Sequence, residues 1–247
     1  MIEMNEVSIH SHNLNLDSDD INSWSNYFEI RAREAGIFDT TINSLNFKTK
    51  TSSNVIGNKW LQFSTLMPKV LCLLASKVDS NHARMRILKI AWEELGEGKA
   101  KQIHSATFKI CLDLADVEVK NTPSNANSQL ERYAEGYFRS TSEIFGLGLG
   151  LEIIAVQNIE TVFNGLAYDS IIAFYLKQTE FFQIHFQNEE SHIRHCIESF
   201  MKYCPDNNNK INFLIGFENG LRFWKSFWSE VAVELRLHNQ RRIAWAN

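Results

Sequence analysis

Apolar side chains recur every three or four positions near the C-terminus, from about Lys210 to about His238. The stripe consists of Leu214, Phe217, Leu221, Trp224, Trp228 and Val231. Residues at this spacing lie on one face of an α-helix, whereas a half-buried strand would alternate apolar and polar residues. The pattern therefore predicts a long helix whose apolar face packs in a core.

The rest of the chain shows the same kind of periodicity. Only 3 Pro and 11 Gly among 247 residues leave little material for turns, which favours a few long helices. We expect helices over 18–36, 58–78 with Pro68 kinking it or starting a new segment, 81–95, 99–114 and 130–144, and two more within 168–203. Residues 38–57 and 117–127 are expected to be mainly connections. The predicted fold class is all-α.

Gly146, Gly148 and Gly150 lie in an apolar segment that runs from Ile144 to Val156. A glycine-rich run can bind a nucleotide, but here no strand precedes it and no acidic residue marks a βαβ unit. Glycines on one side of an apolar helix let another helix or a metal site approach closely, and we favour that interpretation.

Composition excludes several classes of protein. The net charge of −4 and the scattered basic residues do not suit a nucleic-acid partner. No apolar run long enough to span a membrane and no secretory signal is evident, so we expect a cytoplasmic protein without a membrane partner. Residues 1–17 are polar and are expected to be flexible, and residues 18–247 are expected to form a single helical domain.

Two histidines and a carboxylate share a helical stripe in the segment Phe181–His195. At 100° per residue, His185, Glu189 and His192 fall within about 60° of one another. Two imidazoles and one carboxylate suit non-haem iron and, less selectively, manganese or zinc. An amphipathic helix with surface histidines would show the same spacing, so this stripe alone does not decide between the two.

Two further features point towards a metal. In Glu94-Leu95-Gly96-Glu97-Gly98, followed by His104, a helix end and a glycine break could deliver a carboxylate and an imidazole to one point. Glu152 is a charge in an apolar segment, and its burial is costly unless a metal or a salt bridge compensates it. A ferritin-type site needs two Glu-x-x-His motifs, and only Glu189-x-x-His192 occurs, which argues against that arrangement.

These residues resemble the signature of haem-oxygenase-like di-iron oxidases, the iron-containing redox enzymes of the haem-oxygenase fold. Residues 92–98 with His104 resemble the family's (D/E)-E-x-G-x-G motif and its following His. His185-x-x-x-Glu189-x-x-His192 resembles the closing helix, and Glu152 stands where the family has a middle-helix carboxylate. The resemblance implies a bundle of about seven core helices around a metal site.

The resemblance also implies chemistry. It implies two Fe(II) ions as cofactor and O2 as co-substrate. The ligands would be Glu94, His104, Glu152, His185, Glu189 and His192, with Glu97 as the alternative to Glu94. Family members oxidise small molecules by N-oxygenation, oxidative C–C cleavage or nitrile formation. We therefore expect a small amine or amino-acid-like substrate, a role in secondary metabolism, an external electron donor for repeated turnover and, by analogy, a homodimer.

Other uses of this fold are weighed against that expectation. Haem binding would need an axial His on the first helix, which has none. A thiaminase-like hydrolase would use a reactive Cys, for which Cys196 is the candidate, but it would not need the histidine stripe. A metal-free protein, either a cofactor-independent oxidase or a non-catalytic small-molecule-binding scaffold, is the alternative that stays open.

Overall fold

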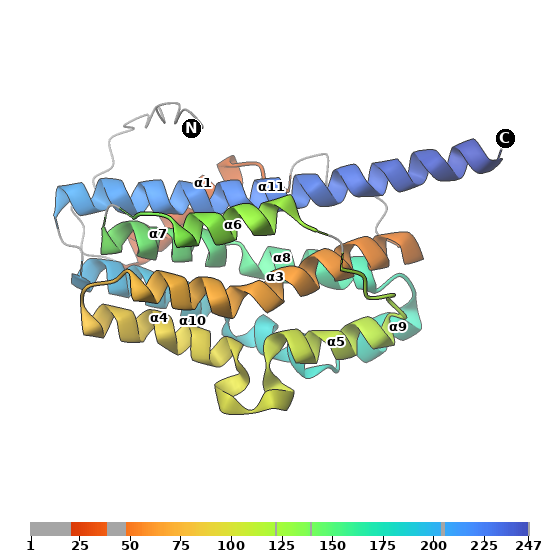
Figure 1. The fold of residues 1–247 in the computed structure, drawn as a ribbon, viewed down its shortest axis with the longest axis horizontal. Helices are drawn as coiled ribbons and strands as arrows, with labels where there is room; N and C mark the ends of the chain where they lie inside the picture. The colour runs from red at the N-terminus through yellow and green to blue at the C-terminus, as the bar shows by residue number, and fades with distance from the viewer. Residues whose placement is uncertain (1–20, 39–47, 122, 139, 204–205, 247) are drawn as a thin grey trace.

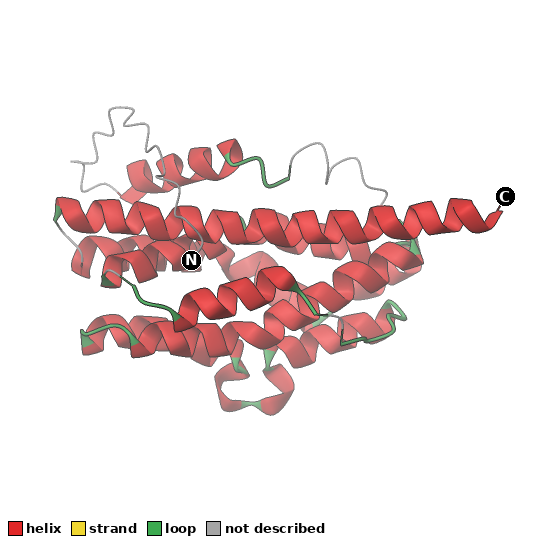
Figure 2. Cartoon of the chain, turned by 45° about the horizontal axis from the view of Figure 1, so that its top comes forward, coloured by secondary structure: helices red, strands yellow, loops and turns green. Residues whose placement is uncertain are grey.

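The computed structural model describes residues 21–38, 48–121, 123–138, 140–203 and 206–246, and of residues 187–192, 203, 207, 239 and 241–246 it describes the backbone alone. Helices account for most of this part of the chain, and no strand occurs in it (Figures 1 and 2). The elements are α1 (Ile21–Glu34), α3 (Lys50–Ser76), α4 (Asn81–Glu94), η1 (Gly96–Gly98), η2 (Ala100–Gln102), α5 (His104–Leu114), α6 (Asn125–Glu135), α7 (Thr141–Glu152), α8 (Ala155–Leu166), α9 (Ser170–Leu176), α10 (Glu180–Tyr203) and α11 (Asn207–Ala246). The all-α prediction is confirmed.

The longest helix, α11, runs along one side of an elongated bundle, and its C-terminal end extends beyond the other helices (Figure 1). Its apolar stripe is buried, as predicted, apart from Leu214, which is partly buried: Phe217, Leu221, Trp224, Trp228 and Val231 are each at most 2% exposed. Trp224 stacks on Trp60 of α3 with ring centroids 5.8 Å apart. The centre of the bundle is therefore aromatic, and it forms the floor on which the site described below is built.

Helix α7 packs against α11 with almost no space between the two backbones. A Cβ atom at Gly146 would collide with the carbonyl oxygen of Phe213, and one at Gly150 with that of Phe217. From the other side, a Cβ atom at Gly216 would collide with the carbonyl oxygen of Glu143. The glycine run of α7 thus serves close helix packing, as the sequence predicted.

Helix α3 begins at Lys50, not near residue 58 as expected. Thr49 caps it with a capping box, because its hydroxyl accepts from Ser52 N while Ser52 Oγ accepts from Thr49 N. Ser52 and Ser53 lie within the predicted polar connection, but both are fully buried by neighbouring helices. The helix also continues through Pro68, although that residue cannot donate a backbone hydrogen bond to Ser64.

Several other boundaries differ from the expected ones. The expected helix over 130–144 is two helices, because α6 begins at Asn125 and ends at Glu135, and α7 starts after Ser140. Helix α11 covers Asn207–Ala246 instead of about 210–238. The apolar segment after it is also split, with α8 starting at Ala155. Helix α5 starts at His104 instead of residue 99, since the turns η1 and η2 fill the interval. By contrast, α4, α9 and α10 lie where the sequence placed them.

Among the described residues, one segment, Thr141–Leu166, is long and apolar enough to cross a membrane. It comprises α7 and α8, and 67% of its most apolar window is buried inside the bundle. Core helices have this composition too, so the segment is weak evidence for a membrane span.

Candidate metal centre and its cavity

Glu94 and His104 are brought together by a tight reversal of the chain. Glu94 is the last residue of α4 and His104 the first of α5. Gly96 and Gly98 between them have φ values of 66° and 83°, a left-handed conformation that glycine adopts without strain, and Glu97 between the two glycines has a φ of 52°. A Cβ atom at Gly96 would also collide with the backbone of Gln102. As a result, Oε2 of Glu94 lies 3.1 Å from Nδ1 of His104.

His185 of α10 completes this group. Its ring centroid lies 4.7 Å from that of His104, at an angle of 61° between the two planes. One potential ligand atom from each of Glu94, His104 and His185 lies within 4.8 Å of the other two. Two ligands about 2.1 Å from one ion are separated by at most about 4.2 Å, so small side-chain rotations would let the three share an ion.

The protonation of His185 suits a metal ligand. Its burial, together with the neighbouring His104, lowers its pKa from 6.5 to about 4, so the ring is neutral at physiological pH. Nδ1 lies 2.7 Å from the carbonyl oxygen of Phe181, which can only accept, so Nδ1 carries the proton. The lone pair therefore resides on Nε2, the state that a metal-bound imidazole requires.

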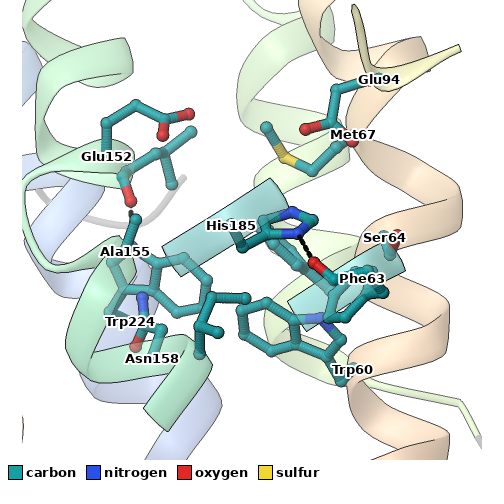
Figure 3. A pocket seen from close by; sticks show the side chains of 13 residues that line it. Trp60, Phe63, Ser64, Met67, Glu94, Glu152, Ala155, Asn158, His185 and Trp224 are labelled. Carbon is teal, nitrogen blue, oxygen red and sulfur yellow. Dashed lines mark hydrogen bonds between the residues drawn. The ribbon is translucent and has the colours of Figure 1, made fainter. Parts of the chain in front are cut away.

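Glu152 lies on the far side of the same cavity. It is the last residue of α7, and it is partly buried. Its charge tends to raise the pKa values of both His185 and Cys196, which places it near these two side chains. Figure 3 shows Glu152 and Glu94 on opposite walls at one end of the cavity. His185 lies further along the cavity, towards its other end. Glu152 is not in the three-residue cluster, but it faces the same space.

The remaining predicted ligands are placed as follows. Helix α10 is continuous over Glu180–Tyr203, so Glu189 and His192 occupy the positions four and seven residues after His185, as the predicted stripe requires. Their side chains lie outside the described part of the chain. Glu97, the alternative to Glu94, is exposed and is not in the cluster with His104 and His185, so the geometry favours Glu94.

The cavity has a volume of about 50 Å³ and extends from Glu94, Glu152 and His185 into the aromatic core (Figure 3). Its walls come from α3, α4, α7, α8, α10 and α11, and the further lining residues are Trp60, Phe63, Ser64, Met67, Leu151, Ala155, Asn158, Ile159, Phe181 and Trp224. Little in the sequence points to these residues, because helical periodicity assigns Trp60 and Phe63 to the core without showing that a cavity lies beside them.

Cys196 does not behave as a nucleophile. It is 3% exposed, and its burial raises its pKa well above the usual range, with Glu152 raising it further. A thiolate is the reactive form of cysteine, so this thiol is unreactive at neutral pH. The thiaminase-like alternative therefore has no support from the geometry.

The donor set fits iron. Carboxylate oxygen and neutral imidazole nitrogen are the ligands of non-haem iron sites. A partly buried carboxylate next to buried imidazoles is also costly to hold without a cation. Glu94, His104, His185 and, across the cavity, Glu152 offer these donors to one small, largely apolar space.

Comparison with known proteins agrees with this geometry. A family model described as "Iron-containing redox enzyme" matches residues 61–225. Two crystal structures of a CADD-like protein of unknown function from Nostoc punctiforme PCC 73102, at 2.00 and 1.35 Å resolution, have similar folds. They match with TM-scores of 0.69 and 0.67 at 17% sequence identity, covering 86% and 87% of this chain and 98% and 95% of that protein. No curated protein matches the chain.

Proposed function

Because the chain belongs to the family of iron-containing redox enzymes, we propose that it is an O2-dependent non-haem di-iron oxidase or oxygenase. The observation that carries the proposal is the convergence of Glu94, His104 and His185, with Glu152 facing them across an apolar cavity. Iron chemistry follows from the family. The two-iron stoichiometry and the use of O2 are our inference from the number and kind of the ligands.

Six residues would hold the metal: Glu94, His104, Glu152, His185, Glu189 and His192. Two Fe(II) ions held there would supply the electrons that reduce O2. The neutral ring of His185 offers Nε2 without first losing a proton, since Nδ1 carries the ring proton and donates it to the carbonyl oxygen of Phe181. The carboxylates of Glu94 and Glu152 offset the charge of the cations, and the apolar walls keep bulk water away.

The substrate that we propose is a small amine or an amino-acid-like molecule. The small volume of the cavity supports a small substrate. Within this proposal, N-oxygenation, oxidative C–C cleavage and nitrile formation are the candidate reactions, an external donor returns electrons, and the protein works in the cytoplasm in secondary metabolism. We further propose that it forms a homodimer and has neither a nucleic-acid nor a membrane partner.

Anaerobic titration of the metal-free protein with Fe(II) tests the proposal. We expect about two irons per chain, and an O2-dependent visible absorption when the loaded protein is exposed to air. His185→Ala should lose iron and the O2-dependent absorption, because it removes a ligand. His82→Ala is the matched control, since His82 is an exposed histidine on α4, and it should bind iron like the wild type.

Two outcomes would contradict the proposal. If the wild type binds no iron, the metal-free alternatives, a cofactor-independent oxidase or a binding scaffold, take its place. If His185→Ala retains the iron content and turnover of the wild type, the assignment of His185 as a ligand is wrong.

A further inference from the structure

Two buried N–H groups line the cavity at the end away from the carboxylates. Trp60 is 5% exposed and Asn158 is 0% exposed. Within the described part of the chain, neither Nε1 of Trp60 nor Nδ2 of Asn158 has a hydrogen-bond acceptor. Both residues line the cavity that also contains Glu94, Glu152 and His185, and Figure 3 shows them at its opposite end.

The orientation of the Asn158 amide is fixed by its neighbour. Nε1 of Trp228 donates to Oδ1 of Asn158 at 2.8 Å. An indole N–H can only donate, so the amide oxygen must face Trp228 and the NH2 group must point elsewhere. Asn158 is 0% exposed, so its NH2 group does not face bulk solvent.

Other tryptophans of the same core are satisfied, which makes Trp60 unusual. Nε1 of Trp224, a ring stacked on Trp60, donates to the carbonyl oxygen of Leu151 at 2.9 Å. A buried donor without an acceptor costs roughly 1–3 kcal/mol. Two such donors on one cavity would be stabilised by a ligand that brings an acceptor.

The charge of the cavity restricts what that ligand can be. Within the part of the chain whose side chains are described, the ionisable residues of its lining are Glu94, Glu152 and His185, and no Lys or Arg is among them. An anion at the donor end would have no Lys or Arg beside it, and the metal ions of the proposed function would lie at the other end, where the carboxylates of Glu94 and Glu152 already offset their charge. An ammonium group there would place its own N–H bonds against those of Trp60 and Asn158.

We propose that this end of the cavity binds a neutral hydrogen-bond acceptor of the substrate, a carbonyl or carboxamide oxygen. The inference rests on the proposed function, because that function decides which end of the substrate reacts. The acceptor binds at Trp60 and Asn158, and the short hydrocarbon part extends towards Glu94 and Glu152. It narrows the amino-acid-like substrates to those whose carboxyl group is uncharged, as in an amide.

A set of three probes of equal chain length tests the proposal. A water-sized group needs about 10–15 Å³, so about 50 Å³ accommodates roughly four such groups. Propanamide, propanoate and propylamine have about this size and differ in the charge of the head group. We would titrate each into the full-length protein, both loaded with diamagnetic Zn(II) and metal-free, and follow binding by ligand-observed NMR. Propanamide should bind about tenfold more tightly than either charged probe.

Two variants remove the donors one at a time. Trp60→Phe keeps an aromatic ring and removes one N–H. Asn158→Leu combined with Trp228→Phe removes the amide without leaving the indole of Trp228 unpaired. Each should weaken propanamide binding by roughly tenfold, the effect of one lost hydrogen bond in a dry site, while metal content is unchanged.

Matched controls separate the loss of a donor from the loss of packing. Trp224→Phe removes an indole N–H that already donates within the protein, so it should retain propanamide affinity within about twofold. Trp228→Phe alone keeps the Asn158 amide but removes the donor that fixes its orientation, so it is the reference against which the double variant is compared.

The inference is overturned if the three probes bind equally, or if Trp60→Phe and the double variant leave propanamide binding unchanged. In either case the proposed function stands if iron still binds. If no metal binds but propanamide still depends on Trp60 and Asn158, the proposed di-iron function fails and the acceptor site is supported.

Discussion

At the scale of single residues, His185 links the folding of the chain to the chemistry of its site. Burial beside His104 keeps its imidazole neutral, and the carbonyl oxygen of Phe181 holds the proton on Nδ1. A metal gains from this arrangement because the ligand atom is deprotonated before binding. In the metal-free protein, a histidine that stays neutral in the folded state makes the free energy of unfolding depend on pH.

That dependence can be measured. The folded-state pKa of His185, about 4, lies below the ordinary 6.5, so the unfolded chain takes up a proton in this window and the folded chain does not. Stability therefore falls as the pH falls from about 6.5 towards about 4, and the loss from this residue between pH 7 and pH 5 is about 2 kcal/mol. Urea unfolding of the metal-free protein at several pH values checks it.

His185→Gln should flatten this part of the pH profile. His82→Gln, which removes an exposed histidine, should keep the slope of the wild type. Superimposable profiles for wild type and His185→Gln would show that this histidine is not buried in its neutral form.

At the scale of elements, the contact between α7 and α11 decides where Glu152 stands. Gly146 and Gly150 on α7 and Gly216 on α11 bring the two backbones into contact. Glu152 ends α7, and Trp224 of α11 donates to the carbonyl oxygen of Leu151 one residue earlier. The glycines thus set the wall of the cavity that carries this carboxylate.

Two glycines two residues apart should respond in opposite ways to alanine. Gly146→Ala should destabilise the protein by about 3 kcal/mol or more, because its Cβ collides with backbone atoms of Phe213 that cannot move independently. Gly148→Ala should change stability by less than about 1 kcal/mol and in the stabilising direction. Its Cβ would meet only Sγ of Cys196, at 3.6 Å.

Urea unfolding of the two variants is the measurement, and Gly148→Ala is the control for helix propensity. Equal stabilities would mean that α7 and α11 are not in close contact.

At the scale of the whole molecule, one core connects the first described helix to the last. Buried apolar residues from Trp24 to Leu235 form a single cluster. Polar contacts connect the same elements: Lys59 of α3, itself buried, lies 2.8 Å from Oε1 of Glu230 on α11, and that carboxylate also accepts from the N-terminal backbone of α6 at Asn125 and Ala126. The site lies inside this shared core.

We therefore predict that the chain unfolds as one unit, in line with a single domain over residues 18–247. Two probes should give coincident urea transitions. Circular dichroism follows helix content, and fluorescence follows the six tryptophans, of which Trp60, Trp224 and Trp228 lie in the centre. A fluorescence transition that precedes the loss of helix would show that the core around the cavity opens separately.

Local patterns were enough to predict much of this fold. Ser80 caps α4 and Gly96 ends it, and both signals are chemical properties of the residues themselves. The start of α3 was missed because Ser52 and Ser53 are polar, and only neighbouring helices bury them. The split at Gly136 was missed because apolar residues continue at helical spacing on both sides of it.

The sequence by itself determined the helical class, the glycine break that brings a carboxylate to His104, and the spacing of His185, Glu189 and His192 along one helix, because each depends on residues close together along the chain. It left Glu94 and Glu97 open, and the structure places Glu94 beside His104. Only the tertiary structure decided that Trp60 and Asn158 share a cavity with Glu94 and Glu152. The physical reason is that a cavity wall is assembled from helices distant in sequence, so its shape and its unpaired donors are set by packing between helices, which no local periodicity encodes.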